Sequence, residues 1–170
     1  MAFYDGHGHF AKPVLQIVSQ TISSVTSVTI NAGQADLGID ATITPQSSSS
    51  RILIMAAISF DTTRQNEAGG WRIKRGGPNG TLIGNAQEVG SRYAVHSGFQ
   101  ANADMDQSSR RTMILHLDHP NTTSSTEYSI VPYKRESGNM TVYLNRAKND
   151  PSQADDGRYI TTVTLMEFGN

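Results

Sequence analysis

Short runs in which apolar and polar residues alternate follow one another along nearly the whole chain, and no segment has the pattern of a helix. The clearest run is 36–44, where Leu37, Ile39, Ala41 and Ile43 share one face while glycine and polar residues share the other. A period of two with one apolar face is typical of a strand at a sheet surface. A succession of such strands predicts an all-β fold, and we expect a jelly-roll-like β-sandwich.

The run RILIMAAISF at 51–60 differs from the others because both of its faces are apolar. Its isoleucine content and the nearby turn signals favour a central strand over a buried helix. Two explanations for the second apolar face remain, a loop that covers it or a subunit interface. In the second case we expect the interface to contain Ile52, Ile54, Ile58 and Phe60.

The remaining alternating runs bring the total to about ten strands, the number typical of a sandwich or jelly roll. Two polar segments, 61–70 and 98–110, are expected to be loops. Trp71 fits the core better than a sugar-stacking platform, because a single tryptophan in an alternating strand is usually buried. The further strands are expected at 71–75, 81–84, 91–97, 111–118, 127–135, 140–145 and 158–168. The predicted core contains Leu37, Ile39, Ile43, Trp71, Ile73, Leu115 and Leu117.

Composition excludes several classes of protein. The chain has 170 residues, which suits one domain with an arm, and it has no cysteine, so disulfides and thiolate metal sites are excluded. Its net charge of −1 argues against nucleic acid as the main partner, which would favour a basic stripe. No stretch approaches the ~20 apolar residues of a membrane-spanning helix, so we expect no membrane partner.

Residues 1–12, ahead of the expected body at 13–170, fit no strand of this pattern. They contain Phe3, Tyr4 and Phe10 among glycines, together with His7 and His9. Disordered tails are usually poor in aromatic residues, which gain much free energy when they are buried. We therefore expect an extended N-terminal arm that becomes ordered on a partner surface and anchors the protein there through these five residues.

Few residue patterns point to chemistry. The histidines of DGHGH at 5–9 and of HLDH at 116–119 are suitable metal ligands, but a polar terminal segment and a solvated strand end explain them better. The acidic pairs at 104–106 and 155–156 lack the further oxygen ligands that calcium needs. No nucleophile elbow, phosphate-binding loop or zinc-protease motif occurs. We expect no enzyme, no catalytic residue, no metal and no cofactor.

An ordered series of segments resembles a β-domain common in tailed bacteriophages, especially those of cyanobacteria. The resemblance covers nearly all of 12–168 and rests on the order of the segments, since no single motif is diagnostic. The segments are KPVLQIV (12–18), ITP (43–45) with the serines after it, RILIM (51–55), WRIKRG (71–76), SRY (91–93), LDHP (117–120), EY (127–128), VYLNR (142–146) and 160–168.

The resemblance implies a non-enzymatic virion protein with a jelly-roll-like body, and a homotrimer. Such domains occur in head-decorating proteins and at tail-fibre tips. The chain has no long shaft, no heptads and no evident tail-docking domain, so we expect a capsid decoration (cement) protein. It would be made in the host cytoplasm and would bind the major capsid protein on the outer surface of the capsid. The alternative is a tail-fibre tip that recognises host carbohydrate through the loops at 61–70 and 98–110.

Overall fold

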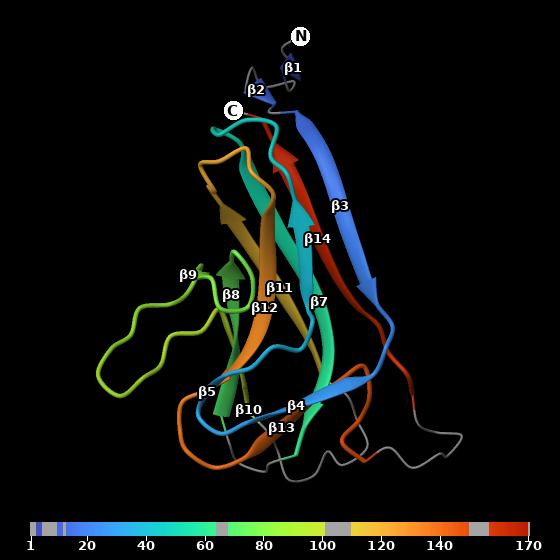
Figure 1. Ribbon diagram of the computed structural model, residues 1–170, viewed down its shortest axis with the longest axis vertical. Coiled ribbons are helices and arrows are strands. Elements are labelled where there is room, and N and C mark those ends of the chain that lie inside the picture. Colours follow the sequence, from blue (N-terminus) through green and yellow to red (C-terminus); the bar gives the residue numbers. More distant parts are fainter. Residues whose placement is uncertain are drawn as a thin grey trace.

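The computed structural model of this chain describes residues 3–4, 10–11, 13–63, 68–100, 110–149 and 157–169. These residues form strands and connecting segments, and none of them is in a helix, which confirms the all-β prediction. Two six-stranded antiparallel sheets face each other across one hydrophobic core, as expected of a β-sandwich (Figure 1). The strands run mostly along the long axis of the body, and Val14 and Phe168 are paired at one end of it.

In the first sheet, called sheet 1, β12 is the central strand. It pairs with β8 along one edge and with β5 and β6 along the other, while β9 and β10 pair with β8. The strands of sheet 1 are β5 (Gly33–Gln34), β6 (Asp40–Ile43), β8 (Ala68–Arg75), β9 (Thr81–Ile83), β10 (Ser97–Gln100) and β12 (Thr126–Lys134).

In the second sheet, called sheet 2, the long strand β7 is central, as its apolar sequence predicts. It pairs with β11 along one edge, and with β14 and then β13 along the other. Strand β3 extends the sheet beyond β14, and β4 extends it beyond β13. The strands of sheet 2 are β3 (Val14–Ile22), β4 (Thr26–Ile30), β7 (Arg51–Thr62), β11 (Arg110–Asp118), β13 (Met140–Leu144) and β14 (Thr161–Phe168).

The N-terminal segment, where the sequence suggested no strand, contains the two short strands β1 (Phe3–Tyr4) and β2 (Phe10–Ala11). They pair with each other, with Phe3 opposite Ala11 and Tyr4 opposite Phe10. The side chains of this segment, and the whole of His7 and His9, lie outside the described residues. Their anchoring role therefore stays a prediction.

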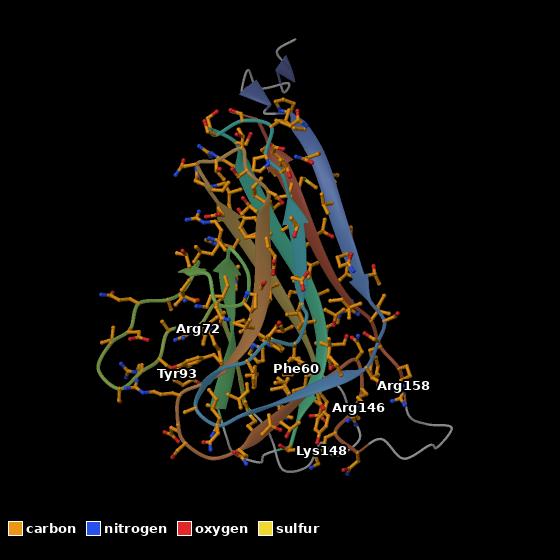
Figure 2. The ribbon with its side chains drawn as sticks, in the orientation of Figure 1. Phe60, Arg72, Tyr93, Arg146, Lys148 and Arg158 are labelled. Carbon is orange, nitrogen blue, oxygen red and sulfur yellow. The ribbon has the colours of Figure 1, made fainter. Side chains whose placement is uncertain are left out.

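The core contains five of the seven side chains predicted for it: Leu37, Ile39, Ile43, Trp71 and Ile73 are at most 5% exposed. Trp71 lies against Phe60 and Phe99, with ring centroids 5.0 and 5.7 Å away. Phe60 lies inside the body in Figure 2. The buried position of Trp71 rules out the sugar-stacking alternative for this residue.

Two adjacent glycines make this aromatic packing possible. A Cβ atom added to Gly69 would lie 2.6 Å from the Phe99 ring, and one added to Gly70 would lie 2.6 Å from Val95. Real Cβ atoms do not approach other atoms so closely. Strand β8 therefore needs glycine at both positions to let the neighbouring side chains contact its backbone.

The prediction that Leu115 and Leu117 also lie in the core is wrong. Leu115 is 63% exposed and Leu117 is 41% exposed, because β11 turns its opposite face inward and buries Ile114 completely.

Two strand boundaries also differ from those predicted from the sequence. The segment 91–97 forms no regular strand, and the strand in this region is β10, which occupies the start of the expected loop at 98–110. Both ends of the expected loop at 61–70 are strand instead, because β7 continues to Thr62 and β8 begins at Ala68.

Over residues 51–57, strand β7 is buried on one face only. Ile52, Ile54, Ile58 and Phe60, the residues expected at a subunit interface, are at most 1% exposed and lie in the core of a single chain. Their side chains are therefore not on a surface that a second subunit can contact. The opposite face of β7 carries Leu53, Met55 and Ala57, which alternate with the buried residues, and this is the face that remains for a partner.

Candidate attachment surface

The face of sheet 2 that points away from sheet 1 is apolar over four adjacent strands, and we call it the outer face. Its most exposed apolar side chains, Met113 at 68%, Leu115 at 63% and Ile17 at 58%, lie on the two strands at the edges of this region, β11 and β3. The outer face comprises Ile17, Leu53, Met55, Ala57, Met113, Leu115, Leu117, Met166 and Phe168.

The strand register brings these side chains together. Leu117 lies opposite Leu53, Leu53 opposite Met166, and Met166 opposite Ile17, so one apolar row crosses β11, β7, β14 and β3. Directly opposite residues in antiparallel strands point to the same side and contact each other. The result is a contiguous apolar patch, and such patches on soluble proteins typically mark an interaction site.

Strand β11 is also an edge strand. It pairs with β7 along one side, and among the described residues no backbone hydrogen bond occupies its other side. A long apolar edge strand is a template onto which a strand of another chain can add. The outer face therefore offers a partner apolar side chains and, over 111–118, a strand edge that pairs with no other strand among the described residues.

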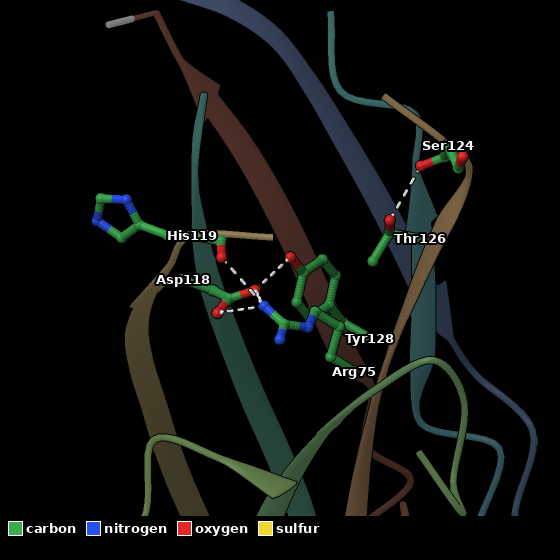
Figure 3. Close-up of polar contacts among 6 residues, drawn as sticks. All are labelled: Arg75, Asp118, His119, Ser124, Thr126 and Tyr128. Carbon is green, nitrogen blue, oxygen red and sulfur yellow. Dashed lines mark hydrogen bonds and ion pairs between the residues drawn. The ribbon is translucent and has the colours of Figure 1, made fainter. Parts of the chain in front are cut away.

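The orientation of β11 is fixed at its end by a buried carboxylate (Figure 3). Asp118 is only 7% exposed and accepts hydrogen bonds from the Tyr128 hydroxyl at 2.7 Å and from Arg75 Nη1 at 3.0 and 3.1 Å. The same Arg75 atom donates to the carbonyl oxygen of His119. Because Asp118 points toward sheet 1, Leu117 and every second residue before it must point outward.

The phenol of Tyr128 stays a donor in this arrangement. Burial, together with the hydrogen bond to Asp118, raises the pKa of Tyr128 far above its ordinary value, so the proton is retained. The Asp118 carboxylate is therefore both neutralised by Arg75 and hydrogen-bonded by Tyr128. A buried charge that is paired and hydrogen-bonded in this way keeps one orientation, because any other would leave it without partners.

A shallow apolar hollow of about 300 Å³ lies at one end of the outer face. It is lined by Arg51, Leu53, Leu117 and Phe168. The Nε atom of Arg51, one of these lining residues, is buried and has no hydrogen-bond partner among the described residues. A buried donor without an acceptor is uncommon in folded proteins, so the hollow is suited to a ligand that brings an apolar group and an acceptor.

Glu167 connects three segments on the inner side of sheet 2, at the end where the hollow lies. It is fully buried, and its carboxylate accepts hydrogen bonds from Gln16 Nε2 of β3 at 2.5 Å and from the Gln46 backbone N–H at 2.7 Å. Burial raises the pKa of Glu167, but the hydrogen bonds outweigh it, so the pKa lies below its usual value. The ionised carboxylate thus ties β14 to β3 and to the loop before β7.

A second surface feature lies on sheet 1, around the segment 85–96. The guanidinium of Arg72 lies 3.3 Å from the ring centroid of Tyr133, and the rings of Tyr133 and Tyr93 lie 5.7 Å apart. Arg72 also donates to the carbonyl oxygen of Ala94, which fixes this segment onto β8. Figure 2 shows Arg72 and Tyr93 on the same side of the body. Partly exposed aromatic rings of this kind can stack on a sugar.

The described residues contain no group of three or more metal ligands. Within 116–119 the polar side chains diverge: His116 points between the sheets toward His96, with ring centroids 6.0 Å apart, while Asp118 is occupied by Arg75. Burial lowers the pKa of His116, which favours its neutral form. The candidate at 5–9 and the acidic pairs at 104–106 and 155–156 lie outside the described residues. In the part of the chain that is described, no helix is suited to cross a membrane.

Three solved structures resemble this chain over nearly its whole length. They are all from infectious bursal disease virus. The structure of the Gt strain has 13% identity, a TM-score of 0.45 and 99% of this chain covered, and that of the Gx strain has 16% identity, a TM-score of 0.40 and 95% covered. The structure of the VP2 subviral particle has 14% identity, a TM-score of 0.41 and 94% covered. This chain spans 38–43% of the length of those chains. Comparison with protein-family models gave no match, and neither did comparison with curated proteins.

Sequence reasoning placed Leu115 and Leu117 in the core and therefore missed the outer face. One signal was present: the run 111–117 has more apolar residues on the exposed face than on the buried one, which carries Thr112 and His116 besides Ile114. The two apolar faces of 51–60 gave the second signal, because they require a second apolar surface somewhere in the fold. Each signal fits an uncovered sheet face better than it fits an ordinary core strand.

Proposed function

We propose that this chain is a virion structural protein of a tailed bacteriophage, and specifically a capsid decoration (cement) protein. The observation that carries the proposal is the contiguous apolar outer face, with its free edge strand β11. A surface of this kind is costly to leave in water and becomes favourable when a partner covers it. The resemblance of the sequence series at 12–168 to a phage virion domain supports the identity of that partner.

In this proposal the partner is the major capsid protein of the assembled head, and the decoration protein lies on the outer surface of the capsid. A protein that binds only the assembled lattice stabilises that lattice, because dissociation of the capsid must also release the bound protein. A homotrimer would contact several capsid subunits together, so that modest single contacts add up through avidity. No catalytic chemistry and no cofactor take part.

The N-terminal arm at 1–12 supplies a second attachment element. Burial of Phe3, Tyr4 and Phe10 on the capsid protein contributes about 1.5–3 kcal/mol for each ring. Ordering the arm costs roughly 1–2 kcal/mol for each residue, so backbone hydrogen bonds to the partner must contribute as well. His7 and His9 lie between these aromatic residues and complete the proposed anchor.

The copy number in purified particles tests the proposal. A decoration protein is present in proportion to the capsid subunits, whereas a fibre tip is present in only a few copies. Quantitative mass spectrometry against the major capsid protein measures this ratio directly. A ratio near that of a tail-fibre protein would overturn the decoration proposal.

One observation favours a second candidate function, recognition of host carbohydrate by a tail-fibre tip. The partly exposed rings of Tyr93 and Tyr133, with Arg72 between them and the segment 85–96, form a surface on which a sugar could stack. Glycan-array binding that is lost on Tyr93→Ala would support this alternative. The outer face of sheet 2 has no role in it.

A further inference from the structure

We infer that the hollow lined by Arg51, Leu53, Leu117 and Phe168 is the docking site of the chain's own N-terminal arm, with Phe3 or Tyr4 in the hollow and Asp5 on the Arg51 guanidinium. The inference concerns the free protein and does not rest on the proposed function. It follows from the chemistry of the hollow, from the position at which the arm leaves the body and from the sequence of the arm.

The hollow defines what can fill it. Three of its four lining side chains are apolar, and the fourth is that of Arg51, whose buried Nε has no acceptor among the described residues. An arginine in such a position is best satisfied by a carboxylate, which accepts charge-assisted hydrogen bonds from the guanidinium. The occupant should therefore present an apolar side chain directly beside a carboxylate.

The sequence of the arm contains one place where an apolar side chain lies directly beside a carboxylate. Asp5 is the only acidic residue at 1–12, and it directly follows Phe3 and Tyr4. The pair of rings and the adjacent carboxylate match the apolar walls and the Arg51 guanidinium, whose Nε lacks an acceptor among the described residues. The outer face itself, with Arg51 at one end and Arg111 at the other, carries no carboxylate of its own among the side chains that define it.

The arm also starts at the hollow. Val14 pairs with Phe168, one of the lining residues, and the Gly169 N–H donates to the Pro13 carbonyl oxygen at 3.0 Å. Strand β2 ends three residues before Val14, and β1 pairs back onto it with Phe3 opposite Ala11. Three residues of chain and one strand spacing together span roughly 15 Å, so Phe3 and its neighbours can reach the hollow of the same chain.

A second copy of the chain is a poorer occupant. Two outer faces placed against each other would bring guanidinium groups together without a carboxylate to pair them, and like charges across an interface cost free energy. Docked in the hollow, the arm instead covers the apolar end of the outer face and pairs Arg51. When a partner surface is offered, the same rings can exchange from the hollow onto it.

Disulfide trapping in the full-length protein tests the inference, because the chain has no cysteine of its own. The variant Tyr4→Cys/Leu117→Cys places one thiol on the arm and one in the wall of the hollow. Its matched control, Tyr4→Cys/Met113→Cys, moves the second thiol four residues along the same face of β11, about 13 Å away. We expect the first pair to form an intrachain disulfide at least tenfold faster than the control pair.

Charge variants then test the pairing. In the Tyr4→Cys/Leu117→Cys background, Asp5→Asn or Arg51→Gln should slow disulfide formation several-fold, while Arg111→Gln should leave the rate unchanged. A second trapping pair, Tyr4→Cys/Phe168→Cys, repeats the test in case Leu117→Cys perturbs the edge strand. Equal rates for the hollow and control pairs would overturn the inference. So would disulfides formed between chains, or rates that do not respond to Arg51→Gln.

Discussion

Asn145 shows how much one buried polar residue contributes to joining distant segments. It is fully buried in a left-handed conformation (φ 61°), and its Nδ2 group donates to the carbonyl oxygens of Ile22 and Ser24 at 2.8 and 2.9 Å. Its Oδ1 atom accepts a hydrogen bond from Thr161. One side chain thus ties the turn after β3 and the start of β14 to the end of β13.

We predict that Asn145→Ala lowers the free energy of unfolding by about 2–4 kcal/mol, because it removes three hydrogen bonds and leaves the buried Thr161 hydroxyl group without an acceptor for its hydrogen. Asn121→Ala is the matched control, since Asn121 is exposed and also has a positive φ of 54°. Both variants carry the same backbone strain, so the difference between them reports the hydrogen bonds. Urea unfolding measures both, and equal losses would contradict the role assigned to Asn145.

Glu167 gives a pH prediction at the same scale. Its pKa is lowered in the folded state, so it contributes stability above the pKa of the unfolded chain and loses that contribution as the pH falls through the folded value. We expect the stability of the native protein to fall from about pH 5 downward. The variant Glu167→Gln should be less stable at neutral pH and should show a shallower acid dependence. Parallel pH profiles for the two proteins would show that Glu167 is not responsible.

Strand β11 shows at the scale of an element what sequence periodicity can and cannot determine. The alternation at 111–118 predicted the strand and its length, because a period of two is a local property. It did not predict which face is buried, since that choice depends on contacts of Asp118 with Arg75 and Tyr128, which lie 43 and 10 residues away in sequence. The hydrophobic pattern usually sets the facing of a strand, but here the paired charge overrides it.

In the rest of the fold, too, local periodicity predicted the strands, and it predicted their buried face only where the other face is polar. The core positions Leu37, Ile39, Ile43, Trp71 and Ile73 were predictable because each lies in a strand whose other face is polar. The apolar run 51–60 was correctly predicted as a central strand, but Ile52, Ile54, Ile58 and Phe60 were expected at a subunit interface and lie in the core instead. Two apolar faces give no local signal for which of them is buried. The hollow could not be predicted, since Arg51, Leu117 and Phe168 come from three strands that only the sheet register brings together.

Adjacent residues of β11 provide the matching prediction. Ile114→Ala removes a fully buried side chain and should cost about 2–5 kcal/mol of stability. Leu115→Ala removes a side chain that is 63% exposed and should change stability by no more than about 0.5 kcal/mol. Thermal or urea unfolding of the two variants distinguishes the orientations. A larger loss for Leu115→Ala would mean that β11 faces the other way.

At the scale of the whole molecule, the fold combines a closed core with one apolar face that its own described residues leave uncovered. The buried residues of both sheets belong to a single cluster, so the body needs no partner to complete its core. The outer face and the free edge of β11 are surfaces that association would cover. Stability therefore comes from the inside of the sandwich, and attachment is proposed to occur through the outside of sheet 2.

The homotrimer remains a prediction at this scale. We expect light scattering at micromolar concentration to give a mass about three times the 18.4 kDa of one chain. The variant Leu115→Asp, with a charge in the middle of the outer face, shows whether that face takes part in the trimer: the variant dissociates if it does and stays trimeric if another surface is used. A monomer for the native protein would contradict the trimer.

The most direct test of the central claim is the affinity of the full-length protein for phage heads that lack it. Three proteins are compared by co-sedimentation: the native chain, Leu115→Asp on the outer face, and Leu82→Asp, which changes a leucine that is 37% exposed on β9 of sheet 1. If attachment occurs through the outer face, the native chain and Leu82→Asp bind equally, and Leu115→Asp loses at least tenfold in affinity, about 1.4 kcal/mol. Equal binding of all three proteins, or no binding by the native chain, would contradict the account.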